Sequence, residues 1–153
     1  MGGLYFEDVE VGDGYTAGPR SVTKGEIIRF AQQYDPVPEK IDEEAAAHSI
    51  FGGLTASGPL IFSIYILLTS QLQPRLHFLG GLGWDELRMP NPVHPNDELD
   101  LELIVLEKRE SKSKADRGIL RLRIILRNQR RETVLECLVA VLIARRPDAK
   151  ASA

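Results

Sequence analysis

The chain has 153 residues, a length that suits one domain with a substantial core. Hydrophobic residues make up 43% and charged residues 27%, as in ordinary globular proteins, and a net charge of −3 argues against nucleic acid or an anionic membrane as a partner. The single cysteine, Cys137, excludes an internal disulfide framework, and we expect a soluble cytoplasmic protein.

We expect neither a signal peptide nor a membrane-spanning helix in this sequence. The N-terminus lacks the basic start and the apolar stretch of a signal peptide. The longest apolar helical stretch, residues 59–68, falls short of the ~20 residues that span a bilayer. Residues 147–153 have nothing to bury, so we expect one domain over residues 1–146 and a flexible tail over 147–153.

The first predicted helix covers residues 24–34. Thr23 and Glu26 fit a capping box, in which the threonine caps the helix and the glutamate reaches back to it, and apolar residues follow at helical spacing. Pro36 and Pro38 prevent its continuation. This pattern places Asp35 just past a helix end.

A short second helix is predicted over residues 43–47, with Asp42 as its cap. The next helix begins at Ser57 or Gly58, and Pro59 lies in its first turn, where the missing N–H costs nothing. Residues 60–68 are apolar almost all round, which indicates a helix buried on most sides. Other elements must therefore wrap around it.

The second half of the chain favours strands. Apolar and polar residues alternate in part of it, with the period of a strand that has one buried and one wet face, and Cys137 lies in an apolar run that favours a buried thiol. The predicted strands cover residues 79–88, 99–110, 119–128 and 134–145. The result is an α+β domain, in which an antiparallel β-sheet is wrapped around a long central buried helix.

Several short motifs occur in order along nearly the whole chain, at residues 5–13, 22–23, 30–31, 35–38, 51–53, 56–58, 83–88 and 92–97. Together with the predicted sheet around a helix, they resemble the hot-dog fold of the MaoC-like dehydratases, which include the (R)-specific enoyl-CoA hydratases. The resemblance implies hydration of a 2-enoyl thioester, or dehydration of a 3-hydroxyacyl thioester, carried on coenzyme A or a related pantetheine. It implies no cofactor apart from the coenzyme A of the substrate, and a role in fatty acid metabolism.

The resemblance also implies site residues. Asp35 falls on the position of the family's catalytic aspartate, and Gly58 on that of the oxyanion donor, a backbone N–H at the start of the central helix. Gly53 and Ser57 are the expected substrate-binding residues, although Gly52 and Gly53 can also serve backbone geometry alone.

Lys40 occupies the position of the family's catalytic histidine. An imidazole accepts a proton on one nitrogen while it donates through the other, whereas an ammonium has three donors and no acceptor. A desolvated lysine can lose its proton, but an ion pair with Asp35 would instead hold that carboxylate ionised. We therefore expect hydratase activity that is weak, absent or redirected.

For the histidines and for three arginines, a structural role fits the sequence better than a functional one. His48 lies between Asp35 and Gly58 and could supply an imidazole, although an exposed place near a helix end fits it better. No histidine has a partner at metal-ligand spacing, so we expect no metal site. Three arginines could meet the phosphates of coenzyme A, but charged hairpin tips are usually solvated: Arg127, Arg130 and Arg131.

Three functions remain open. The first is a hydratase or dehydratase with Asp35 as base, Gly58 as oxyanion donor and Lys40 as an altered partner. The second is a non-catalytic acyl-thioester-binding protein or partner subunit, and the third is a hot-dog thioesterase in which Asp35 activates water against the thioester carbon. In each case the resemblance implies an acyl-CoA-type ligand and a homodimer or higher oligomer of dimers, because exposed sheet edges are normally paired.

Overall fold

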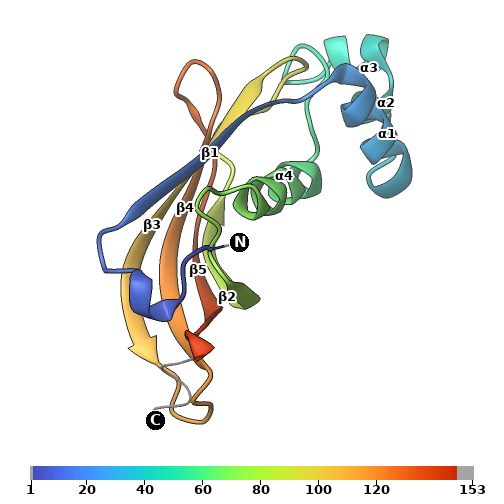
Figure 1. Ribbon diagram of the computed structural model, residues 1–153. Helices are drawn as coiled ribbons and strands as arrows, with labels where there is room; N and C mark the ends of the chain where they lie inside the picture. The colour runs from blue at the N-terminus through green and yellow to red at the C-terminus, as the bar shows by residue number, and fades with distance from the viewer. Residues whose placement is uncertain (1, 148–153) are drawn as a thin grey trace.

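The computed structural model describes residues 2–147 and forms one curved sheet with helices on one side of it and beyond one end (Figure 1). After a 3₁₀ turn at Phe6–Asp8, the helices are α1 (Lys24–Tyr34), α2 (Pro38–Ile41), α3 (Glu43–Ala47) and α4 (Gly58–Ser70). The strands are β1 (Gly14–Ser21), β2 (Phe78–Arg88), β3 (Glu98–Glu110), β4 (Arg117–Arg127) and β5 (Thr133–Ala144). The last residues of the predicted tail, 148–153, lie outside the described range.

All neighbouring strands are antiparallel, in the order β1-β3-β4-β5-β2, which makes β1 and β2 the two edges. Figure 1 shows α4 on the concave side of this sheet. The alternation predicted for β4 is confirmed, because Leu122 and Ile124 are buried while Arg123 between them is exposed. The predicted α+β sheet around a central helix is therefore present.

Helix α4 supplies the helical side of the core. Five of its side chains are buried: Leu60, Ile61, Ile64, Tyr65 and Leu68. Ile66 and Leu67 are 44% and 37% exposed in the single chain. No described residue fully covers these two apolar side chains. No helix in residues 2–147 is long and apolar enough to cross a bilayer.

Helix α1 has the predicted bounds, and the Thr23 hydroxyl accepts a hydrogen bond from the Glu26 N–H at 3.1 Å. The predicted capping box is wrong in its second half. The Glu26 carboxylate does not reach back to Thr23 but accepts from the Arg20 guanidinium at 2.9 Å, because a bidentate cation is the stronger partner. This ion pair joins α1 to β1.

Two elements were not predicted. Strand β1 has few large apolar residues and contains Gly18 and Pro19, which are typical of an edge strand with an irregular register. Helix α2 begins at Pro38, since proline is compatible with the first position of a helix as well as with the end of the preceding one. Helices α1, α2 and α3 lie together beyond one end of the sheet (Figure 1).

Candidate active site

The segment that precedes α4 is extended and buried. The Ala56 N–H donates to the Val93 carbonyl at 2.8 Å, and the His94 Nδ1 lies 3.3 Å from the Leu54 carbonyl oxygen. Leu54, Thr55, Ala56 and Ser57 are all buried. These contacts fix the place from which α4 begins.

Ser57 is the N-cap of α4, yet its hydroxyl makes no capping bond. An N-cap side chain normally accepts from the second or third N–H of the helix. The second helical residue is Pro59, which has no N–H, and the Leu60 N–H donates to the Ser57 carbonyl at 3.0 Å. The Ser57 Oγ is therefore buried without a partner among the described residues, in a side chain that is 1% exposed.

The N–H of Gly58 also donates to none of the described residues. It belongs to the first turn of a 13-residue helix, where the aligned peptide dipoles favour negative charge. The unpaired N–H and the unpaired Ser57 hydroxyl are adjacent in the chain. Together they provide two hydrogen-bonding groups for one oxygen atom that the chain itself does not supply.

The glycines near this helix start differ in what they require. A Cβ on Gly58 would lie 3.2 Å from the Met89 Sδ, so a side chain there would crowd the strand end. Gly52 has a φ of 69°, which favours glycine, whereas a Cβ on Gly53 would meet nothing within 4 Å. The space beside Gly53 is open, and its role in substrate binding stays a prediction.

Lys40 lies on α2 and is half-buried. Its Nζ donates to the Oγ1 of buried Thr55 at 3.0 Å and lies 5.6 Å from the ring centroid of Phe51. The ion pair with Asp35 that would hold the carboxylate ionised is not formed, and no carboxylate among the described residues pairs with this ammonium. Thr55 as the partner of Lys40 was not predicted, because nothing in its sequence neighbourhood marks it.

Asp35 follows the last residue of α1 and is half-buried. Its own N–H donates to the Ala31 carbonyl and its carbonyl accepts from the Val37 N–H, both at 2.8 Å. Its carboxylate accepts no hydrogen bond from the described residues, so its lone pairs are available to water. No described hydrogen bond or ion pair links Asp35 to Lys40 or to Gly58.

Asp42 and His48 have the structural roles expected from the sequence, a helix cap and an exposed position at a helix end. Asp42 caps α3 and accepts from the Glu44 N–H at 3.0 Å. His48 is exposed at the C-cap of α3 and lines a cavity of about 340 Å³ together with Lys40 and Thr55. No cluster of metal-ligating side chains occurs among residues 2–147.

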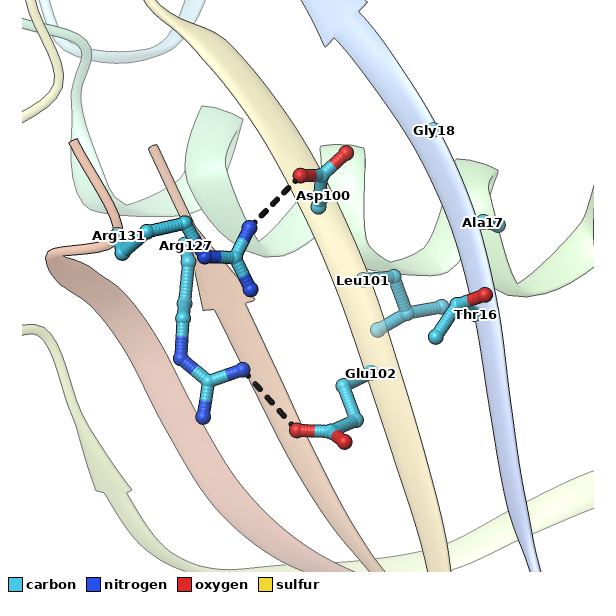
Figure 2. Close-up of a pocket in the computed structure, with 8 residues that line it drawn as sticks. All are labelled: Thr16, Ala17, Gly18, Asp100, Leu101, Glu102, Arg127 and Arg131. Atoms are coloured by element: carbon cyan, nitrogen blue, oxygen red, sulfur yellow. Dashed lines mark hydrogen bonds and ion pairs between the residues drawn. The ribbon is translucent and has the colours of Figure 1, made fainter. Parts of the chain in front are cut away.

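The three arginines already have carboxylate partners. Arg127 pairs with Glu102 at 3.0 Å and Arg131 with Asp100 at 2.9 Å, on the face of the sheet opposite α4 (Figure 2). Arg130 pairs with Glu132 at 3.0 Å. The structure therefore favours a structural role for these side chains over a phosphate site.

An apolar cavity of about 250 Å³ lies between α4 and β2. Trp84 lines it, and its indole N–H donates to the Tyr65 hydroxyl at 3.1 Å. Burial raises the pKa of Tyr65 to about 12, so this phenol stays neutral. The sequence did not indicate this cavity, because its walls come from five elements that are far apart in the chain.

Comparison with known proteins identifies the family. The family model described as "MaoC like domain" matches residues 8–124, most of the chain. The chain belongs to the MaoC-like family. The predicted resemblance is thereby confirmed.

Similar proteins match nearly the whole chain. A MaoC-like dehydratase from Rhodospirillum rubrum is 39% identical, with a TM-score of 0.84 over 95% of this chain and 99% of that one. The uncharacterized protein YdeM of Bacillus subtilis (strain 168) is 29% identical over 93% of this chain and 100% of its own. The R-hydratase PhaJ1 of Pseudomonas aeruginosa, at 23% identity, shares the fold with a TM-score of 0.79 over 94% and 88% of the two chains. The MaoC-like chain thus has the hot-dog fold.

Proposed function

We propose that this MaoC-like protein binds 2-enoyl or 3-hydroxyacyl thioesters of a coenzyme A-type carrier and adds or removes water at their double bond. The observation that carries the proposal is the pair of unpaired groups at the start of α4, the buried Ser57 hydroxyl and the Gly58 N–H. Membership of a family with a dehydratase as a 39% identical member supports it.

The helix start would act on the thioester oxygen. When water adds to the β-carbon, electron density moves to this oxygen and an enolate develops. The Gly58 N–H and the Ser57 hydroxyl would each donate to it, and the positive end of α4 would favour its negative charge. The Ser57 hydroxyl is already buried and the Gly58 N–H is held by the helix backbone, so neither donor has to move far during the reaction.

Asp35 would take the proton of the attacking water. Its carboxylate has no partner among the described residues, which leaves it free to accept a water proton. The water oxygen bonds to the β-carbon while Asp35 takes one proton of the water. Asp35 then returns this proton to the α-carbon of the enolate, which gives the 3-hydroxyacyl thioester and restores the carboxylate. Dehydration is the reverse sequence.

Lys40 would limit the rate of this sequence. In place of an imidazole it offers only donors, and one of them is held by Thr55. The protein would then carry out hydration slowly, because one of the two proton-handling groups of the site is missing.

The apolar cavity between α4 and β2 would receive the acyl chain. Tyr65, which lines it, lies seven residues after Gly58 on the helix, about 10 Å along the axis. Its volume of about 250 Å³ suits a short chain.

A specific observation favours a second candidate, a thioester-binding protein without turnover. Lys40 stands at the position of the family's catalytic histidine, and its ammonium is hydrogen-bonded to Thr55. This side chain cannot accept a proton from water. Such a protein would hold the thioester through the same helix start and the same cavity, and would not release product.

We further propose a homodimer formed through β2. This strand is an edge of the sheet and exposes four large apolar side chains: Leu79, Leu82, Trp84 and Leu87. A long apolar edge of this kind is normally covered, and pairing with the β2 of a second copy would extend the sheet.

Incubation of the purified protein with crotonyl-CoA and with butyryl-CoA tests the function. A 3-hydroxybutyryl product from crotonyl-CoA supports hydration, and its absence from an Asp35→Ala variant would support the assigned base. Saturable binding of both thioesters without product supports the second candidate. Release of free coenzyme A from butyryl-CoA would contradict both proposals.

A further inference from the structure

Lys40 is a fixed ammonium without a negative partner. Its only hydrogen bond to a described residue goes to the neutral Thr55 hydroxyl, and Asp35 does not pair with it. The side chain is half-buried, so part of its hydration is lost, and the loss is not compensated by an opposite charge. Two of its three N–H donors remain available.

The surroundings hold the ammonium in place. Thr55 is 3% exposed and belongs to the segment that is bonded to the 93–94 turn, so it is a rigid acceptor. The Phe51 ring covers another side of the Nζ at 5.6 Å. A cation that is fixed on two sides presents its remaining donors in one direction.

These groups line a cavity of about 340 Å³ between α2, residues 48–51 and Thr55. His48 and Ser49 are also on its wall, and the Ser49 hydroxyl is already used by the Ala46 carbonyl at 2.7 Å. Glu39 is the one carboxylate on this wall, and it is exposed, so water screens its charge. The least screened charge of the cavity is therefore positive.

We propose that this cavity is an oxyanion site, in which Lys40 binds a carboxylate or phosphate group of the thioester ligand. This inference rests on the proposed function for the identity of the ligand, and extends it by naming a charged group on that ligand. Lysine in place of histidine then has a binding role instead of a proton-transfer role.

Two sources of the oxyanion are distinguished by position. Thr55 precedes Gly58 by three residues, which places the two at most about 10 Å apart along an extended chain. A carboxylate at the end of a short acyl group lies within such a distance of the thioester oxygen. An acyl group of this kind would turn towards Lys40, whereas an uncharged acyl chain would enter the apolar cavity between α4 and β2. The phosphates of coenzyme A are separated from the thioester by the whole pantetheine arm, so the acyl carboxylate is the better fit.

Calorimetric titration with succinyl-CoA and butyryl-CoA tests the proposal, because both acyl groups have four carbons and only one ends in a carboxylate. We expect the wild-type protein to bind succinyl-CoA at least about tenfold more tightly, as a charge-assisted hydrogen bond allows. Lys40→Met should abolish this preference, and Lys40→Arg should retain much of it. Lys112→Met, which replaces an exposed lysine on the β3–β4 loop, is the control and should leave the preference intact.

A phosphate ligand gives a different pattern. The wild-type protein would then bind both coenzyme A thioesters with the same affinity, and Lys40→Met would weaken the binding of both. The affinity for pantetheine thioesters without phosphates would not change in Lys40→Met. Indifference of every thioester to Lys40→Met, or an equal effect of Lys112→Met, would overturn the proposal.

A separate titration keeps the two proposals apart. If the wild-type protein binds no thioester, the proposed function fails, and succinate and inorganic phosphate then probe the cavity directly by nuclear magnetic resonance. Shifts of the Thr55 amide and the His48 ring that disappear in Lys40→Met would support the oxyanion site. The absence of such shifts in the wild-type protein would overturn it.

Discussion

The Nζ of Lys40 and the Oγ1 of Thr55 are 3.0 Å apart, and this hydrogen bond joins α2 to the segment that leads into α4. It connects the two halves of the candidate site. Because the bond uses a donor of Lys40 and an acceptor of Thr55, it stabilises the arrangement without providing a base. The candidate site therefore has a donor-rich helix start, and a cation at the position where the resemblance implies an imidazole.

Ser57→Ala should separate stability from function. The buried Ser57 hydroxyl has no partner within residues 2–147, and removal of such a group is expected to raise the free energy of unfolding by about 1 kcal/mol. The same change should weaken thioester binding or slow turnover, since one of two oxygen ligands is lost. Urea unfolding and calorimetric titration measure the two effects.

Ser63→Ala is the matched control on the same helix. Its hydroxyl is exposed and donates to the Pro59 carbonyl at 2.9 Å, so the change should alter stability by less than about 0.5 kcal/mol and leave ligand binding as it was. A Ser57→Ala variant that loses stability and keeps full binding would show that the hydroxyl has a structural role.

Stability should fall at high pH because of Tyr65. Burial raises its pKa from 10.0 to about 12, so the unfolded chain ionises first and the folded chain follows. The stabilisation is complete below pH 10 and is lost as pH rises towards 12, with a total of about 2–3 kcal/mol for this shift. Urea unfolding between pH 8 and about 11 measures the slope.

Tyr65→Phe should give a flatter pH dependence than the wild-type protein, whereas Tyr34→Phe, at a residue that is 64% exposed, should not. The comparison is needed because Tyr15 also has a pKa raised to about 12 by burial and titrates over the same range. Parallel curves for the wild-type protein and Tyr65→Phe would contradict the assignment.

Leu82→Arg should convert a dimer to a monomer. Leu82 is 55% exposed on β2, and a charge there would be buried in a sheet that continues into a second copy. Sedimentation equilibrium gives the mass. Val11 is 61% exposed in the turn before β1, away from β2, so the Val11→Arg variant should remain dimeric. A wild-type protein that is monomeric at high concentration would refute the β2 interface.

Much of the fold was predictable because its signals are local. The period-two pattern of β4 and the start of α4 at Ser57 and Pro59 depend on neighbouring residues alone. Strand β1 was missed because an edge strand buries little and carries no strong apolar pattern. The Glu26 error has a different cause, since its partner Arg20 comes from the preceding strand rather than from the helix.

The candidate site was predictable only in part. Asp35, Lys40 and Gly58 follow from the resemblance, which fixes positions but not contacts. The Lys40–Thr55 bond and the unpaired Ser57 hydroxyl depend on how segments pack in space, and on a proline whose missing N–H leaves the hydroxyl without its usual partner. No pattern along the chain reports such relationships.

The rate of crotonyl-CoA hydration by Lys40→His, compared with the wild-type protein and with Lys40→His/Asp35→Ala, tests the central claim most directly. An imidazole restores an acceptor to the site, so Lys40→His should hydrate crotonyl-CoA at least about 10²-fold faster than the wild-type protein, and the added Asp35→Ala change should remove the gain. A wild-type rate that already equals that of Lys40→His, or a gain that survives Asp35→Ala, would contradict the account.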